Sequence, residues 1–112
     1  MLGLAFKQDV PDLRNSKVAD LVAAFQGLGH RVDVHDPLVS APEALHEYGL
    51  EIVSAPDTAD YDLIVLAVPH RELVEDFARF TGLLAPGGGI VDLKNALAGV
   101  GQAPAGTKLW TM

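Results

Sequence analysis

Short apolar runs alternate along the chain with longer segments in which apolar residues recur at the spacing of a helix. The most apolar run is LIVLAV at 63–68, and it does not alternate with polar residues. A strand of this kind is typical of the centre of a parallel sheet, where both faces are covered. Six runs are predicted as strands, the last of them at an edge: 2–6, 31–35, 51–54, 63–68, 90–92 and 108–111.

A first helix is expected over residues 16–28, where apolar side chains repeat every three or four positions. Either Asn15 or Ser16 can cap its first turn, because short polar side chains accept hydrogen bonds from the first amides of a helix. Gly29 follows the last apolar position and is expected to end the helix.

Two more helices are predicted further along the chain. Ser40 and Glu43 have the spacing of a capping box, which begins a short helix that runs to Tyr48. Another helix is expected over residues 71–80. The sequence PGGG at 86–89 then predicts a flexible turn before the fifth strand.

Strands that alternate with helices predict an α/β fold: a Rossmann-like, doubly wound parallel sheet of five or six strands, in the order 3-2-1-4-5, with helices on both faces. The 112 residues suit a single domain over residues 1–112, since no linker interrupts them. A central strand that begins at the second residue has almost nothing before it. We therefore expect the chain to be a fragment of a longer protein.

The charge and hydropathy of the chain exclude several classes of protein. Eight basic and 15 acidic residues give a net charge of −7, and the basic residues are scattered, whereas a nucleic-acid-binding protein gathers them on one face. No apolar run approaches the ~18 residues that span a membrane, and no secretory signal opens the chain. We expect a soluble protein of the cytoplasm that binds neither nucleic acid nor membranes.

Catalytic groups and metal ligands are scarce. The chain has no cysteine, which excludes disulfides, thiolate metal sites and a cysteine nucleophile. Its four histidines lack the close spacing of a metal site, and no serine stands in a Gly-x-Ser-x-Gly context. We therefore predict no metal site and no catalytic residue within the chain.

The candidate binding residues follow the predicted strands. Ligands of such sheets bind beyond the carboxyl ends of the strands. The cations and the histidine at these ends suit a small anion, because a lysine offers a point charge to a phosphate and an arginine can bind it through two hydrogen bonds. The alternative for Arg14 is a surface ion pair with Asp12. The candidate residues are Lys7, Arg14, His70, Arg71 and Lys94.

Dinucleotide binding by this chain alone is not favoured. The Rossmann fingerprint requires Gly-x-Gly-x-x-Gly directly after the first strand. Here one glycine, Gly3, is followed by the bulky Phe6 at the place where the backbone would approach a pyrophosphate. Asp36 has the position of the acidic residue after the second strand, but it lacks the accompanying glycines.

Residues 3–16 (GLAFKQDVPDLRNS) resemble a signature of the UDP-glucose/GDP-mannose dehydrogenase family, at the start of its C-terminal, UDP-binding domain. Residues 34–39 (VHDPLV) are similar to a second motif of the family, after the second strand. Three further segments are similar in kind and order, so the resemblance spans essentially the whole chain: 60–62 (DYD), 90–95 (IVDLKN) and 109–110 (LW).

The resemblance implies an enzyme that oxidises the C6 alcohol of a UDP-sugar to a carboxylate with NAD as the cofactor. NAD would be held mainly by a separate N-terminal domain, and the enzyme would be a homo-oligomer at full length. By position, Phe6 and Lys7 correspond to residues that contact the UDP part, and Arg14 to one that reaches toward NAD. Lys94 stands where many members have an arginine. A lysine at this place resembles more closely the bacterial enzymes that act on UDP-N-acetylhexosamines or their uronates than those that act on UDP-glucose.

The isolated chain is expected to bind a UDP-sugar but to be inactive, because the cysteine and the NAD fingerprint are absent. Two other functions stay open. The chain could be a stand-alone α/β module for another nucleotide or coenzyme A, although the missing glycines oppose that reading. It could also be an interaction domain that has lost its ligand site, although Lys7 and Arg14 are both present.

Overall fold

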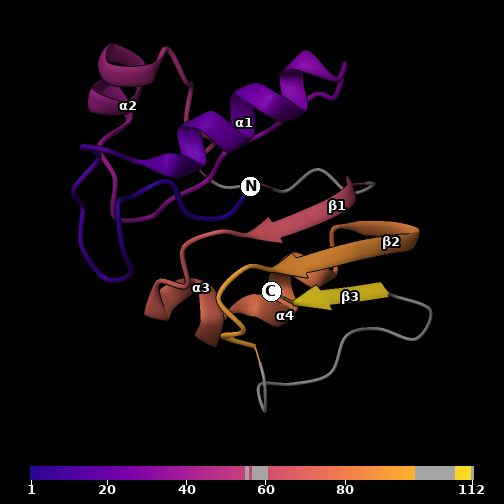
Figure 1. Cartoon of the computed structure of the whole chain (residues 1–112). Coiled ribbons are helices and arrows are strands. Elements are labelled where there is room, and N and C mark those ends of the chain that lie inside the picture. The colour runs from indigo at the N-terminus through magenta and orange to yellow at the C-terminus, as the bar shows by residue number, and fades with distance from the viewer. Residues whose placement is uncertain (55, 57–60, 98–107, 112) are drawn as a thin grey trace.

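The computed structural model describes residues 1–54, 56, 61–97 and 108–111. Within these residues the fold is α/β, and three strands form a parallel sheet in the order β1-β2-β3 (Figure 1). The elements in chain order are α1 (Lys17–Gly27), α2 (Ala41–Tyr48), β1 (Tyr61–Leu66), α3 (Arg71–Glu75), α4 (Phe77–Thr81), β2 (Leu84–Asp92) and β3 (Lys108–Thr111).

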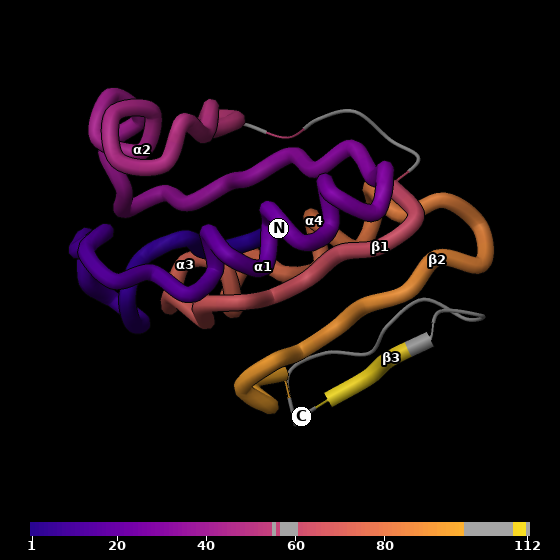
Figure 2. The backbone as a smooth tube through the Cα atoms, turned by 45° about the horizontal axis from the view of Figure 1, so that its top comes forward, coloured from indigo at the N-terminus to yellow at the C-terminus, as the bar shows by residue number. Residues whose placement is uncertain are grey.

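Single parallel bridges continue the pairing beyond β1. Leu2 bridges to Leu66 on one side and to His35 on the other, and Val34 bridges in turn to Ile52. Figures 1 and 2 show β1, β2 and β3 side by side, with the N-terminus next to β1. The segment at Leu2 therefore lies between β1 and the segment at His35.

The first three predicted strands are shorter in the structure than the sequence indicates. Over 2–6, 31–35 and 51–54 the structure has only these isolated bridges, not continuous strands. At the first segment the physical reason is Gly3, whose φ of +91° turns the chain out of the extended conformation directly after Leu2.

Apolar side chains cover both faces of the sheet. Ile64 and Leu66 of β1 pack with Ile90 of β2 against residues of α3 and α4, whereas Val65 packs toward α1. Successive side chains of a strand point to opposite faces, so β1 contributes to both layers, as its unalternating sequence predicts. The buried residues contributed by α3 and α4 are Leu73, Phe77 and Phe80.

The ends of α1 and α2 follow the predicted signals in most respects. Gly29, with φ of +92°, comes directly after the C-cap of α1. Ser16 is the N-cap residue of α1, but its side chain makes no capping hydrogen bond. In α2 the hydroxyl of Ser40 accepts a hydrogen bond from the amide of Glu43 at 3.4 Å, as expected at this N-terminus.

The single helix predicted over 71–80 is instead two short helices. Asp76 separates α3 from α4, and its φ of −104° and ψ of 18° lie outside the helical range. None of the helices in the described ranges is long and apolar enough to cross a membrane.

The glycine-rich turn lies within β2, where the pairing with β1 changes register. Tyr61 of β1 pairs with Leu84, but Leu63 pairs with Gly89, so β2 has extra residues between these two pairs. Gly87, one of these residues, has φ of +79°. The strand thus begins earlier than the predicted 90–92, and the expected turn is a bulge inside it.

Gly3 combines an unusual backbone with a close contact. A Cβ atom added there would lie 2.6 Å from Cβ of Val68 and 2.7 Å from its carbonyl oxygen. The amide of Gly3 also donates a hydrogen bond to the carbonyl of His35 at 2.8 Å. Only glycine allows the chain to turn here while it stays packed against β1 and the residues that follow it.

We expect Gly3→Ala to lower the free energy of unfolding by about 2–5 kcal/mol, because the methyl group meets backbone atoms and the φ value is strained. Urea unfolding followed by circular dichroism measures the loss. Gly87→Ala is the matched control: its φ is also positive, but a Cβ atom there has nothing within 4 Å. It should cost about 1–2 kcal/mol from backbone strain alone. Equal losses in the two variants would contradict the packing argument.

Candidate functional site

The Asp36 carboxylate ties three chain segments together at the carboxyl end of the sheet. Its Oδ2 accepts hydrogen bonds from the amides of Leu4 at 2.7 Å and Ala5 at 3.0 Å. Oδ2 also lies 2.8 Å from Nε2 of His70, and Oδ1 accepts from the amide of Leu38 at 2.9 Å. The side chain has no exposed surface, so these four donors replace its water.

The fully buried ring of His70 connects Asp36 to the loop after Gly3. Its Nδ1 accepts a hydrogen bond from the amide of Asp9 at 2.8 Å. A backbone amide can only donate, so Nδ1 carries no proton, and the ring donates to Asp36 through Nε2–H. The geometry therefore fixes the neutral Nε2–H tautomer.

Hydrogen bonding keeps Asp36 ionised in spite of its burial. Burial raises the pKa of this carboxyl, but the hydrogen bonds from His70 and from the amides of Leu4, Leu38 and Ala5 outweigh it, and the net effect lowers the pKa below 3.8. The ionised form is the one that can accept from all four donors.

The loop between Gly3 and α1 is held at several further points. The amide of Phe6 donates to the carbonyl of Asp12 at 2.7 Å, and the hydroxyl of Ser16 donates to the carbonyl of Leu4 at 2.5 Å. The hydroxyl of Tyr48 donates to the carbonyl of Leu13 and accepts from the amide of Ser16. These contacts make the loop a defined surface rather than a loose connection.

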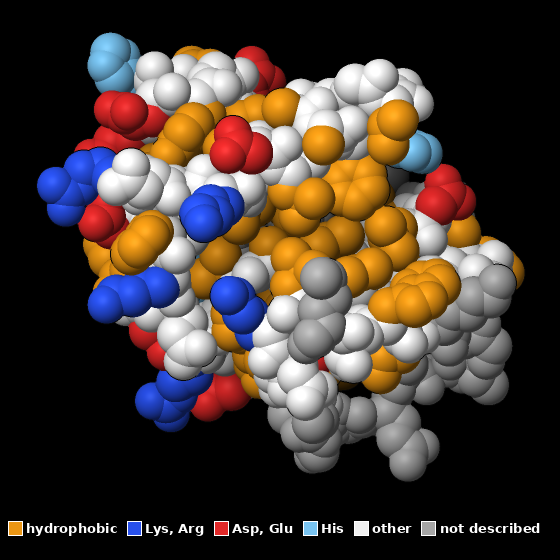
Figure 3. Space-filling model, in the orientation of Figure 1, with side chains coloured by type: hydrophobic (Ala, Val, Ile, Leu, Met, Phe, Trp, Pro, Cys, Tyr) orange, Lys and Arg blue, Asp and Glu red, His pale blue; other side chains and the backbone are white. Residues whose placement is uncertain are grey.

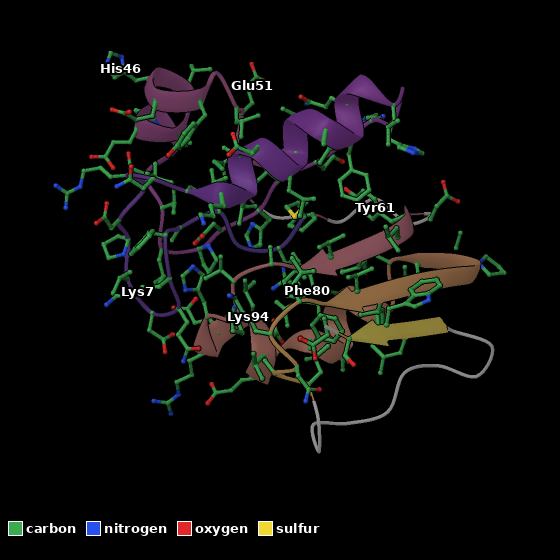
Figure 4. The ribbon with its side chains drawn as sticks, in the orientation of Figure 1. Lys7, His46, Glu51, Tyr61, Phe80 and Lys94 are labelled. Carbon is green, nitrogen blue, oxygen red and sulfur yellow. The ribbon has the colours of Figure 1, made fainter. Side chains whose placement is uncertain are left out.

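Phe6 and Lys7 lie on the outside of this loop. Phe6 is 53% exposed. Lys7 is also exposed, and Figure 4 shows it beyond the ends of the strands. Both side chains are available to a ligand from solvent.

Lys94 lies in a turn that a second buried carboxylate organises. Asp92, at the end of β2, accepts hydrogen bonds from the amides of Ala96 at 2.9 Å and Leu97 at 2.8 Å. Lys94 is exposed in this turn, toward the same end of the strands as Lys7 (Figure 4). Their convergence on one ligand stays a prediction.

The arginines and the two candidate lysines differ in whether they have a carboxylate partner. Each arginine has a carboxylate partner within 4 Å, whereas Lys7 and Lys94 have no hydrogen bond or ion pair with any described residue. The two lysines are therefore the candidate residues without a carboxylate within 4 Å, although the charge of Lys7 contributes to the lowered pKa of Asp12. The arginine pairs are Arg14–Asp12, Arg31–Asp33, Arg71–Glu75 and Arg79–Asp76.

Arg14 forms the surface pair with Asp12 that was the alternative to a binding role. Its Nε and Nη2 both donate to this carboxylate at 3.1 Å, although 83% of the arginine side chain is exposed. The side-chain hydrogen bond from Arg14 lowers the pKa of Asp12. The guanidinium is thus held on the outer side of the loop, at an exposed position.

Two of the five candidate residues have other roles than the predicted one. His70 is buried and both ring nitrogens are used, so it is not available to a ligand. The side chain of Arg71 is engaged by Glu75, while its amide donates to Oδ1 of Asp9 at 2.7 Å. In the sequence Asp36 was matched only to the acidic residue that follows the second strand of a dinucleotide-binding fold, and its structural role was not predicted. Its position between a strand and a proline was the available signal.

A cavity lies near the amino ends of the strands, at the other end of the sheet. A groove of about 430 Å³ is lined by Phe25, Leu63 and Val65, with Arg31 and Asp62 among its polar residues. In Figure 3 hydrophobic side chains fill the centre of this face, while lysines and arginines gather toward the side where the strand arrows of Figure 1 point. The groove is thus separate from Lys7 and Lys94. Within the described ranges no three histidine or carboxylate side chains form a metal-binding group.

We expect Asp36→Asn to lower the free energy of unfolding by about 3 kcal/mol or more at pH 7, since the new amide group must face at least one backbone donor. Because folding lowers the pKa of Asp36, the unfolded chain takes up a proton first as the pH falls. The stabilisation by the carboxylate is complete well above pH 3.8 and is lost as the pH falls below it.

Urea unfolding at a series of pH values tests this. The difference between wild type and Asp36→Asn should shrink as the pH falls below 3.8. The exposed Asp62 provides the control Asp62→Asn, which should change the stability by less than about 0.5 kcal/mol. A constant difference at all pH values would contradict the assignment of the ionised carboxylate.

Comparison with known proteins agrees with the geometry. Residues 1–99 match the model of the UDP-glucose/GDP-mannose dehydrogenase family, UDP binding domain. The chain is 50% identical over 72 residues to UDP-N-acetyl-D-glucosamine 6-dehydrogenase of Pseudomonas aeruginosa, and 31% identical over 97 residues to Protein CapL of Staphylococcus aureus. It is 32% identical over 81 residues to UDP-glucose 6-dehydrogenase TuaD of Bacillus subtilis.

These matches cover 64%, 87% and 67% of the chain, but only 17%, 23% and 17% of the three relatives. The chain thus spans less than a quarter of the length of the curated relatives it matches. The family match extends from the first residue through the turn that carries Lys94. The chain belongs to the UDP-glucose/GDP-mannose dehydrogenase family, and it is the UDP-binding domain of that family.

Proposed function

We propose that the chain binds the nucleotide end of a UDP-sugar beyond the carboxyl ends of its strands, as a domain of an NAD-dependent UDP-sugar 6-dehydrogenase. The observation that supports this most is that Lys7 and Lys94 are exposed and have no carboxylate partner among the described residues, in a protein of net charge −7. The family match gives the class of ligand.

Each proposed contact follows from the chemistry of the side chain. The ammonium groups of Lys7 and Lys94 neutralise the diphosphate as point charges. The exposed ring of Phe6 packs against an apolar face of the nucleotide, because an aromatic ring offers a large contact area with little loss of conformational entropy. Arg14 reaches from the outer side of the loop toward the part of the enzyme that holds NAD.

We also propose a continuous sheet for the complete domain. The bridges at Leu2, Val34 and Ile52 have the order of the predicted arrangement 3-2-1-4-5, with β3 as a sixth strand at the edge. In this arrangement the segments at Leu2 and β1 are neighbours where the sequence of strands reverses. Open α/β sheets bind their ligands at such a point.

The whole enzyme would convert an alcohol, two NAD⁺ and one water into a carboxylate, two NADH and three protons. That chemistry needs a nucleophile to trap the aldehyde and a dinucleotide site. The chain has no cysteine and no glycine fingerprint, so it contributes nucleotide binding alone. The 50% identity to the UDP-N-acetyl-D-glucosamine 6-dehydrogenase of Pseudomonas aeruginosa favours a UDP-N-acetylhexosamine substrate. The complete enzyme would be a cytoplasmic homo-oligomer in polysaccharide biosynthesis.

UDP should bind the 112-residue chain with a Kd of about 0.1–1 mM, because a few charge-assisted contacts at an open surface offset the cost of association only partly. Titration followed by NMR chemical shifts measures this. Lys7→Ala and Lys94→Ala should each weaken binding by about tenfold. Arg31→Ala removes the same charge at the opposite end of the sheet, so it controls for net charge and should leave the Kd unchanged.

NAD and coenzyme A serve as competing ligands in the same titration. Both should bind more weakly than UDP, because the pyrophosphate loop of a dinucleotide site is absent. Tighter binding of coenzyme A or NAD than of UDP, or an equal effect of Arg31→Ala and Lys7→Ala, would contradict the proposed site.

The isolated chain should produce no NADH from NAD and a UDP-sugar. The assay mixes the chain with NAD and either UDP-glucose or UDP-N-acetylglucosamine and follows the absorbance of NADH. No turnover above the protein-free rate is expected, since the chain lacks a cysteine. Steady NADH formation that Lys7→Ala abolishes would show instead that the chain is catalytic by itself.

A further inference from the structure

We propose that His70 is a positioning residue for the nucleotide site: its neutral ring fixes the Asp9 amide and thereby the segment that presents Phe6 and Lys7. This inference rests on the proposed function, because it is the UDP affinity of that segment that His70 would control. The ring itself is buried and does not contact the ligand.

The supporting geometry is a short chain of hydrogen bonds. Asp36 accepts a hydrogen bond from Nε2–H of His70, and Nδ1 of His70 accepts one from the amide of Asp9, each at 2.8 Å. The Asp9 carboxylate then receives the amide of Arg71 at 2.7 Å, so Asp9 is held at both its backbone and its side chain. Asp9 has φ of +60°, a conformation that needs such support in a residue other than glycine.

Lys7 is two residues before Asp9, and Phe6 is bonded through its amide to Asp12 on the far side of the loop. The hydrogen bond between the Asp9 amide and His70 therefore fixes the backbone on one side of Phe6 and Lys7. If it is lost, Phe6 and Lys7 no longer share a fixed orientation, and an open site loses affinity when its groups must be ordered on binding.

Histidine suits this position because its two nitrogens have opposite roles. Protonation would place an N–H at Nδ1 against the N–H of Asp9, so the same ring would then repel the amide that it holds. The hold on the Asp9 amide therefore depends on the unprotonated Nδ1 of the ring.

Substitution of His70 by asparagine or by glutamine tests its two hydrogen bonds, to the Asp9 amide and to Asp36, one at a time. The oxygen of an asparagine lies near the place of Nδ1, so His70→Asn retains an acceptor for the Asp9 amide but loses the donor to Asp36. The side chain of a glutamine reaches the place of Nε2, so His70→Gln retains the donor to Asp36 but loses the acceptor. We expect His70→Gln to weaken UDP binding about fivefold or more, and His70→Asn to leave it within about twofold of wild type.

A ligand-free measurement tests the same inference independently of UDP. The ¹⁵N shifts of the His70 ring should show the Nε2–H tautomer at neutral pH. Hydrogen exchange of the Asp9 amide should be slow in the wild type, because Nδ1 of His70 accepts its hydrogen bond. At the same pH this amide should exchange quickly in His70→Gln and slowly in His70→Asn.

The outcomes separate the two proposals. If the wild-type chain does not bind UDP, the proposed function is wrong, and the positioning role fails with it even where Asp9 exchanges as expected. If UDP binds but both variants weaken it equally, or the ring has the Nδ1–H tautomer, the proposed function stands and the positioning role is wrong. Slow Asp9 exchange in His70→Gln would also overturn the inference.

Discussion

A buried carboxylate is unfavourable unless donors fill its oxygens, and the donors around Asp36 come from three different parts of the chain. The amides of Leu4 and Ala5 belong to the first segment, that of Leu38 to the segment after Val34, and the ring of His70 to the segment after β1. No one segment can satisfy the charge alone. The buried carboxylate therefore requires all three segments to be in place at this end of the sheet. Their arrangement also positions the loop between Gly3 and α1.

Asp92 at the end of β2 has a role similar to that of Asp36 after Val34: each carboxylate fixes the turn that follows it. Both carboxylates are buried, and both accept amides of the turn that follows. The two buried carboxylates thus hold the backbone of these turns, and Phe6, Lys7 and Lys94 lie on the exposed surface. The chain can thus carry a strongly negative net charge and still offer positive charge to an anion at one edge.

The sequence predicts the parts of the structure that depend on local patterns. The unalternating run at 63–68, the Ser40 cap and the stop at Gly29 all correspond to observed elements. It does not predict how far a strand continues, because that depends on partners far along the chain and on the turn that Gly3 makes. The role of His70 was hidden for the same reason: an imidazole looks alike in sequence whether it faces a ligand or a carboxylate 34 positions away.

The contact of Trp110 with Gly89 has a consequence for how the unfolding of this protein can be observed. A methyl group on Gly89 would come within 2.5 Å of Cζ3 of Trp110, so the absence of a side chain in β2 makes room for the indole of β3. The chain has one tryptophan, and it lies half exposed on the last strand of the sheet. Intrinsic fluorescence therefore reports the docking of β3, whereas far-ultraviolet dichroism averages over every element. A spectroscopic midpoint from tryptophan alone measures the detachment of an edge, not the collapse of the core.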